Sequence, residues 1–186
     1  MPKPDGNGAA AQPTPEHGAP AFLPGARSEH SNCFGCCVHN TTGLALSMHH
    51  LEQDGLVSMF RLPERFESYP GVIHGGIVST VLDEVMGNVI AVLDKKLCFT
   101  ITLRVKYLTP LHTNELYRCV ARITRRPESD DEIYKVDGEI HPADRDEALA
   151  IASATYKWIT MSQATTEMSV HPSSIGQYIS YLNPAV

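Results

Sequence analysis

Apolar and polar residues follow two different periods along this sequence. From Gly76 to about Leu93, apolar side chains lie on most sides of a helical projection, which predicts a helix buried on nearly all faces. Downstream, residues 99–108, 115–126 and 133–141 alternate apolar and polar positions, which predicts strands with one buried and one polar face. Residues 148–160 contain enough Ala and Ile for a helix, but Thr155-Tyr156-Lys157-Trp158-Ile159 favours a strand.

Two shorter apolar segments precede the helix, at residues 44–50 and 56–62. A turn at Gln53-Asp54-Gly55 is predicted to join them as a hairpin, and residues 63–73 are predicted to form a loop. The chain is therefore predicted to have an α+β fold, in which one long buried helix lies on an antiparallel sheet of about six strands.

The two ends of the chain differ from this central domain, which is expected to span residues 30–160. Residues 1–29 contain six prolines, four glycines and six alanines, so they are predicted to form a disordered arm. Residues 161–186 are predicted to be an extension with a short helix near residues 173–182.

Composition limits the classes of function. The 186 residues suit one domain, and a net charge of −6 argues against nucleic acid or an anionic membrane as a partner. No apolar run approaching a membrane span is expected, and the N-terminus lacks signal-peptide features, so a cytoplasmic location is expected. The five cysteines are interpreted as free thiols.

The candidate chemistry lies at the start of the predicted helix. His74-Gly75-Gly76 follows a Pro-Gly turn, and Asp83 comes nine residues after the histidine. The first turn of a helix offers free N–H groups and a partial positive charge, which can polarise a carbonyl. A nearby carboxylate can act as a base, so the pair suits acyl transfer. Gly76, Thr80, Asp83 and Gly87 form a stripe of small or polar residues, where a second copy of the chain is expected to approach.

Four segments carry a resemblance to a known family. They are Cys33-Phe34-Gly35-Cys36 with Gly43-Leu44, then Gly71-Val72-Ile73-His74-Gly75-Gly76, then Leu82-Asp83-Glu84, and finally Thr100 with the segment Val105-Lys106-Tyr107-Leu108-Thr109-Pro110. These segments, in this order, resemble those of the hotdog-fold thioesterases, in particular the PaaI-like branch that hydrolyses acyl-CoA.

The resemblance implies a role for each site residue. The Gly75 N–H would polarise the thioester carbonyl, and Asp83 would act as a general base toward water or as a nucleophile. Thr100 would help to hold the water, and His74 would orient the loop or contact the thioester. Gly76 and Ser68 would contact the substrate, although the family often has Asn, Gln or His at the position of Ser68. Active sites in this family lie between subunits, which implies a homodimer or homotetramer with acyl-CoA as substrate. The reaction of the family requires no metal or other cofactor.

Other interpretations remain open at this stage. A hotdog dehydratase or hydratase could use His74 with Asp83, and an acyl-CoA-binding module could bind without turnover. The group His30, Cys33, Cys36, Cys37 and His39 is interpreted as packed thiols rather than a metal site, because no second Cys-x-x-Cys follows. Basic residues on the strands are interpreted as solvated, although one or two could bind coenzyme A phosphates: Arg104, Lys106, Arg118, Arg122, Arg125 and Arg126.

Overall fold

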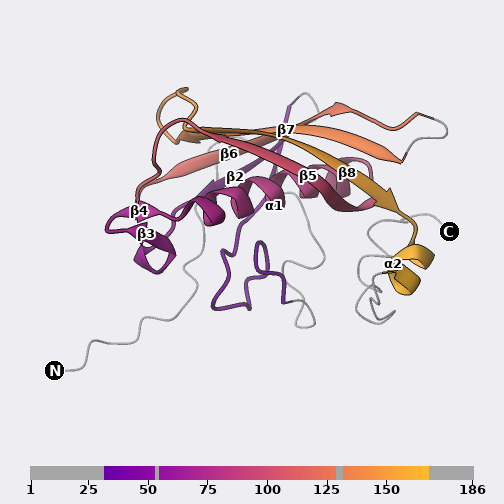
Figure 1. Cartoon of the computed structure of the whole chain (residues 1–186), viewed down its shortest axis with the longest axis horizontal. Coiled ribbons are helices and arrows are strands. Elements are labelled where there is room, and N and C mark those ends of the chain that lie inside the picture. Colours follow the sequence, from indigo (N-terminus) through magenta and orange to yellow (C-terminus); the bar gives the residue numbers. More distant parts are fainter. Residues whose placement is uncertain (1–31, 53–54, 129–131, 168–186) are drawn as a thin grey trace.

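A six-stranded antiparallel sheet forms one layer of the protein, and one long helix packs against it (Figure 1). The computed structural model describes residues 32–52, 55–128 and 132–167. The sheet has the order β1-β2-β6-β7-β8-β5. Its strands are β1 (His49–Leu51), β2 (Gly55–Phe60), β5 (Leu97–Tyr107), β6 (Tyr117–Arg125), β7 (Ile133–Pro142) and β8 (Ala150–Ile159).

The helix α1 (Gly75–Leu93) packs against β2, β5, β6, β7 and β8. The alternation in the sequence explains this packing, because Tyr117, Cys119 and Ala121 of β6 are buried while Arg122 and Thr124 are exposed. The predicted α+β fold, with one long helix on a sheet of six strands, is confirmed.

Among the described residues, α1 has the length and composition of a helix that could cross a membrane. The expectation that no apolar segment approaches that length is therefore wrong for α1. Its buried residues pack into the core of the fold, which accounts for their apolar character: Val78, Val81, Leu82, Val85, Met86, Val89, Ile90 and Val92.

Three local features differ from the sequence-based prediction. The predicted strand at residues 44–50 is reduced to β1, because Ala45 adopts a positive φ of 51° that interrupts an extended chain. The predicted loop at residues 63–73 contains the 3₁₀ helix η2 (Glu64–Phe66) and a two-stranded sheet, β3 (Glu67–Tyr69) with β4 (Val72–Ile73). A short helix, α2 (Met161–Glu167), follows β8 directly.

The hairpin of β1 and β2 is confirmed, since Leu51 pairs with Gly55. Its predicted turn residues Gln53 and Asp54 lie outside the described residues, as do the predicted arm at residues 1–29 and the predicted helix at residues 173–182.

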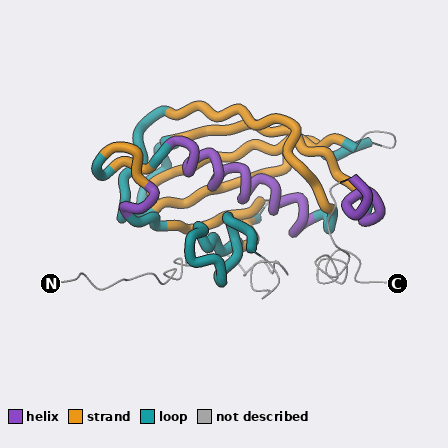
Figure 2. Tube along the Cα trace, turned by 60° about the horizontal axis from the view of Figure 1, so that its bottom comes forward, coloured by secondary structure: helices purple, strands orange, loops and turns teal. Residues whose placement is uncertain are grey.

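The segment before β1 lies against α1. In Figure 1 the indigo trace from residue 32 onward runs below α1, on the side of the helix away from the sheet, and Figure 2 shows the same segment as a teal loop beside the helix. Cys36, Leu44, Leu46 and Met48 from this segment belong to the core cluster. The helix is therefore covered on one side by the sheet and on another by this segment, which explains why its sequence is apolar in several directions.

A bulge in β5 decides which way its side chains point. Thr100 pairs with Tyr156 and Thr102 pairs with Thr155, so Ile101 is the extra residue between two regular stretches. Strict alternation back from Leu103 would place Thr100 on the outer face of the sheet. Because of the bulge, both Thr100 and Leu103 lie on the side of α1, and the hydroxyl of Thr100 reaches the helix.

Candidate active site

The start of α1 is capped by its own preceding residue. The ring of His74 accepts a hydrogen bond at Nδ1 from the N–H of Gly76, at 2.9 Å. That N–H is therefore occupied, whereas the N–H of Gly75 has no partner among the described residues. The His74 ring thus acts as a helix cap, which also leaves the Gly75 N–H as a donor available to a ligand.

A tyrosine from the edge strand fixes this helix start. The hydroxyl of Tyr107 donates to the carbonyl of Gly75 at 3.1 Å and shares a second hydrogen bond with Ser79 Oγ at 2.6 Å. Sequence reasoning assigned no role to Tyr107 or Ser79. The only signal for Tyr107 was its predicted position on the buried face of the strand, beside Leu103 and Val105.

The carboxylate of Asp83 is half-buried and held by two hydroxyls from neighbouring strands. Thr100 Oγ1 donates to Asp83 Oδ1 at 2.8 Å, and the Tyr156 hydroxyl donates to the same oxygen at 3.1 Å. No hydrogen bond from the described residues reaches Oδ2. One oxygen is therefore anchored, while the other remains available to a water molecule or an acyl carbon.

Two groups beside Asp83 are held in their protonated form. Burial raises the pKa of Tyr156, and the charge of Asp83 raises it further, so Tyr156 remains a neutral donor. Burial and Asp83 also raise the pKa of Cys98 to about 12, which keeps this thiol protonated. Tyr156 was missed in the sequence analysis, although it lies directly opposite Thr100 on the adjacent strand.

The helix start and the carboxylate do not form one site within a single chain. Gly75 and Asp83 are eight residues apart on the same helix, which separates them by about 12 Å along its axis at 1.5 Å per residue. Reacting groups must come within about 3–3.5 Å of each other. The expectation that the helix end lies beside the carboxylate is therefore wrong within one chain, and His74 and Asp83 cannot act as an acid–base pair there either.

The other predicted site residues lie at two places along α1. Ser68 and Gly76 are exposed near the start of α1. At the other end of the predicted stripe, a Cβ added at Gly87 would lie 3.5 Å from the ring of Tyr156 in the same chain. The Gly87 end of the stripe therefore lies against the protein's own sheet, whereas Asp83 is only half-buried.

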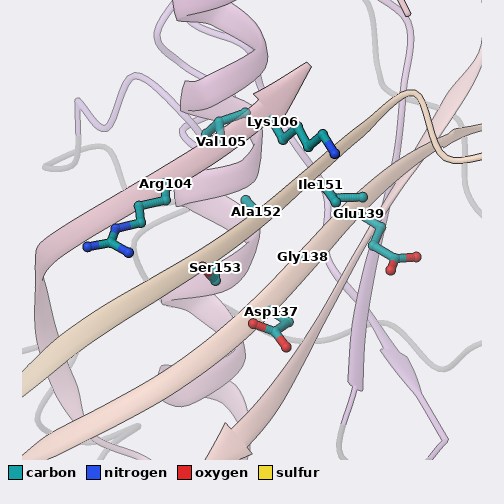
Figure 3. Close-up of a pocket in the computed structure, with 9 residues that line it drawn as sticks. All are labelled: Arg104, Val105, Lys106, Asp137, Gly138, Glu139, Ile151, Ala152 and Ser153. Atoms are coloured by element: carbon teal, nitrogen blue, oxygen red, sulfur yellow. The ribbon is translucent and has the colours of Figure 1, made fainter. Parts of the chain in front are cut away.

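The outer face of the sheet carries a separate depression. Figure 3 shows Arg104, Lys106, Asp137, Glu139 and Ser153 around it. Arg104 pairs across the sheet with Ser153, which pairs in turn with Asp137, so these three share the face opposite α1. This depression is therefore distinct from the Asp83 site. Two other basic side chains are paired, Arg118 with Asp146 and Arg126 with Asp94.

The hydroxyl of Thr100 allows a direct test of the anchored carboxylate. We expect Thr100→Val to lower kcat about tenfold with little change in KM, because a hydrogen bond to a charged group contributes roughly 1.5–3 kcal/mol. Thr100→Ser keeps the hydroxyl and should retain most of the activity. Steady-state kinetics on both variants is the measurement, and equal activity of Val and Ser would contradict this role.

Comparison with known proteins gives one family match. The model of the thioesterase superfamily matches residues 70–128, which include the start of α1, Asp83 and Thr100. Residues 70–128 are therefore similar to the thioesterase superfamily, and the fold is the hotdog fold of the solved thioesterase structures that it resembles. No curated protein gives a significant match to the sequence.

Solved structures share the fold over 61–68% of this chain. A thioesterase superfamily protein, RHA08564, superposes with a TM-score of 0.61 at 19% identity over 68% of this chain, but the match spans only 60% of that protein. A phenylacetic acid degradation-related protein from Ralstonia eutropha JMP134 superposes with a TM-score of 0.54 at 25% identity. The match covers 62% of this chain and 86% of that protein. The protein smu.793 from Streptococcus mutans UA159, solved with acetyl-CoA, superposes with a TM-score of 0.55 at 18% identity. The match covers 61% of this chain and 88% of that protein.

Proposed function

We propose that this protein is an acyl-CoA thioesterase of the PaaI-like branch. The observation that carries the proposal is the Asp83 carboxylate, with Oδ1 held by Thr100 and Tyr156 and Oδ2 open. The match of residues 70–128 to the thioesterase superfamily supports thioester chemistry, and the likeness to a protein solved with acetyl-CoA supports an acyl-CoA ligand. The likeness to a phenylacetic acid degradation-related protein supports the branch.

The proposed reaction uses two groups of α1, the N–H of Gly75 at its start and the carboxylate of Asp83 near its middle. The thioester carbonyl oxygen accepts a hydrogen bond from the Gly75 N–H, which stabilises the negative charge that develops on it. As a general base, Asp83 Oδ2 takes a proton from water, and the hydroxide adds to the carbonyl carbon. The tetrahedral intermediate then collapses, the C–S bond breaks, and the coenzyme A thiolate leaves and is protonated.

Asp83 could instead attack the carbonyl directly. Its Oδ2 would then form an acyl anhydride as the thiolate leaves, and water would hydrolyse that anhydride to the free acid and the original carboxylate. Both routes require Oδ2 to be free and the Gly75 N–H to face the carbonyl oxygen.

The function is tested with a panel of acyl-CoA substrates that covers short, long and aromatic acyl groups. Release of coenzyme A is measured with a thiol-reactive dye, and ligand binding is measured separately by calorimetry. Turnover of at least one acyl-CoA to free acid and coenzyme A is expected. Binding without thiol release would indicate a binding module, and formation or loss of a double bond would indicate a hydratase or dehydratase.

We also propose that the active site is shared between two copies of the chain in a homodimer or homotetramer. The separation of about 12 Å along α1 means that one thioester can meet Gly75 of one copy only with Asp83 of another. The edge strand β5 offers the surface for such an association. No strand from the described residues pairs with its outer edge, and it exposes the apolar residues Phe99 and Ile101, followed by Leu108 at its end.

Complementation between inactive variants is expected if the site is shared. In a two-fold dimer, a mixed pair of Asp83→Asn and Gly75→Pro chains contains one intact site and one doubly altered site. Random mixing of equal amounts should therefore restore about a quarter of the wild-type activity. The measurement is thiol release by the co-expressed variants. Activity no higher than the sum of the separate variants would show that each site lies within one chain.

Association through the edge strand is tested with a matched pair of surface substitutions. Ile101, which is 47% exposed on β5, is replaced by lysine, and Val38, which is 43% exposed outside the sheet, is replaced by lysine as the control. We expect Ile101→Lys to dissociate the assembly and abolish turnover, because a charge on the edge opposes strand pairing. Light scattering gives the mass of each variant. A fully active wild-type monomer at micromolar concentration would rule out the shared site.

A further inference from the structure

Two cysteines and a glutamate from distant parts of the chain come together beside α1. The Sγ atoms of Cys33 and Cys36 and a carboxylate oxygen of Glu84 all lie within 4.8 Å of one another. Cys33 Sγ lies 3.6 Å from Glu84 Oε1 and 3.7 Å from Oε2. Cys36 is buried, and the other two are half-buried. The sequence showed only the two cysteines, since Glu84 follows Cys33 by 51 residues.

The turn that carries the cysteines is held in place by backbone hydrogen bonds. The N–H of Leu44 donates to the carbonyl of Phe34, and the N–H of Leu46 donates to the carbonyl of Gly35. A Cβ added at Gly35 would lie 2.3 Å from the carboxyl group of Glu84. Glycine at this position therefore lets the carboxylate lie directly on the turn, in contact distance of both thiols.

The charge of Glu84 has no cationic partner among the described residues. Its side chain accepts a hydrogen bond from Asn88 Nδ2 at 2.8 Å and from the Cys33 thiol. A carboxylate and two thiols thus share a partly buried space, where a negative charge that is not compensated is unfavourable.

We propose that Cys33, Cys36 and Glu84 bind a zinc ion. Thiolates and a carboxylate are ligands that Zn²⁺ accepts, and a site with three protein ligands leaves a fourth position for water. For tetrahedral Zn²⁺ with bonds of about 2.3 Å to sulfur and about 2.1 Å to oxygen, the sulfur and oxygen ligands lie about 3.6 Å apart. The Cys33–Glu84 separations fit this value, and they also suit a hydrogen bond. The deciding observation is therefore that no cation from the described part of the chain pairs with the Glu84 carboxylate.

The ion would link the turn at residues 33–36 to the helix that carries the catalytic candidate. Glu84 is adjacent to Asp83, so the ion would fix α1 against the segment that covers it on the side away from the sheet. This inference does not depend on the proposed hydrolase activity, because metal binding is measured directly.

The first experiment measures binding by the full chain. The protein is reduced, freed of metal with a chelator, and titrated with Zn²⁺ alone. We expect one ion per chain with micromolar or tighter affinity. With Co²⁺ as a spectroscopic substitute, a thiolate-to-cobalt charge-transfer band is expected. No stoichiometric binding would overturn the proposal, and the loss of two thiols on mild oxidation in the same sample would identify a disulfide-forming pair instead.

Variants then assign the ligands. Cys33→Ser, Cys36→Ser and Glu84→Gln should each weaken Zn²⁺ binding by about tenfold or more, because even the loss of an indirect partner weakens such sites by about 10–100-fold. Gly35→Ala keeps all three ligands but displaces the carboxylate, so it should also weaken binding. The controls are Cys98→Ser and Glu64→Gln, which lie outside the cluster and should bind normally. Unchanged binding in all four cluster variants, or equal losses in the controls, would refute the assignment.

Discussion

Replacing Asp83 with asparagine is expected to lower kcat by about 10²-fold or more, as for the loss of a general base or nucleophile. The amide keeps a carbonyl oxygen that can accept the hydrogen bonds from Thr100 and Tyr156, so the fold and the side-chain position should persist. What is lost is the oxygen that accepts a proton or attacks the acyl carbon. Thiol release from acyl-CoA gives kcat, and thermal unfolding checks the fold.

A second carboxylate provides the control for this substitution. Asp137 is exposed on the outer face of the sheet, away from α1, so Asp137→Asn should retain wild-type kinetics. Substrate binding by the Asp83→Asn variant should also persist, because Asp83 acts on the reacting centre. Near-normal kcat in a folded Asp83→Asn protein would rule out the proposed mechanism.

Replacing Gly75 with proline should remove the carbonyl-polarising N–H without disrupting the helix. Gly75 is the first residue of α1, where proline is well tolerated because that N–H has no partner in the helix. His74 has φ −61° and ψ 133°, an extended conformation that suits a residue before proline. We expect kcat to fall by about 10²–10³-fold, the usual effect of losing one such donor.

The variant Gly75→Ala tests whether the size of the side chain matters at this position while the N–H is kept. A Cβ at this position would lie 3.7 Å or more from the nearest atoms, which belong to the Tyr107 ring, so alanine fits without displacement. Alanine keeps the N–H, and its kcat should remain within a few-fold of wild type. Kinetics and circular dichroism on both variants distinguish the outcomes. Equal loss in both variants would show that bulk, and not the N–H, matters at residue 75.

The local patterns of the sequence were sufficient to predict the main elements. The apolar segment starting at the glycine pair predicted α1 to within one residue of its start, and period-two alternation predicted β6 and β7 closely. Such elements depend on which faces are buried, and burial is encoded in the spacing of apolar residues. Asp83 was also proposed as a site residue from the sequence, because a carboxylate is unusual in so apolar a helix.

The tertiary structure decided what depends on contacts between distant residues. The bulge at Ile101 turns Thr100 toward Asp83, against the alternation of the strand, and the pairing of β5 with β8 brings Tyr156 to the same carboxylate. The fold of residues 33–46 over α1 brings Glu84 to the two cysteines. The sequence by itself determined the elements and the chemical groups, since both follow from local composition and spacing. Only the packing of the chain on itself decided which groups meet, because those contacts join residues far apart in sequence.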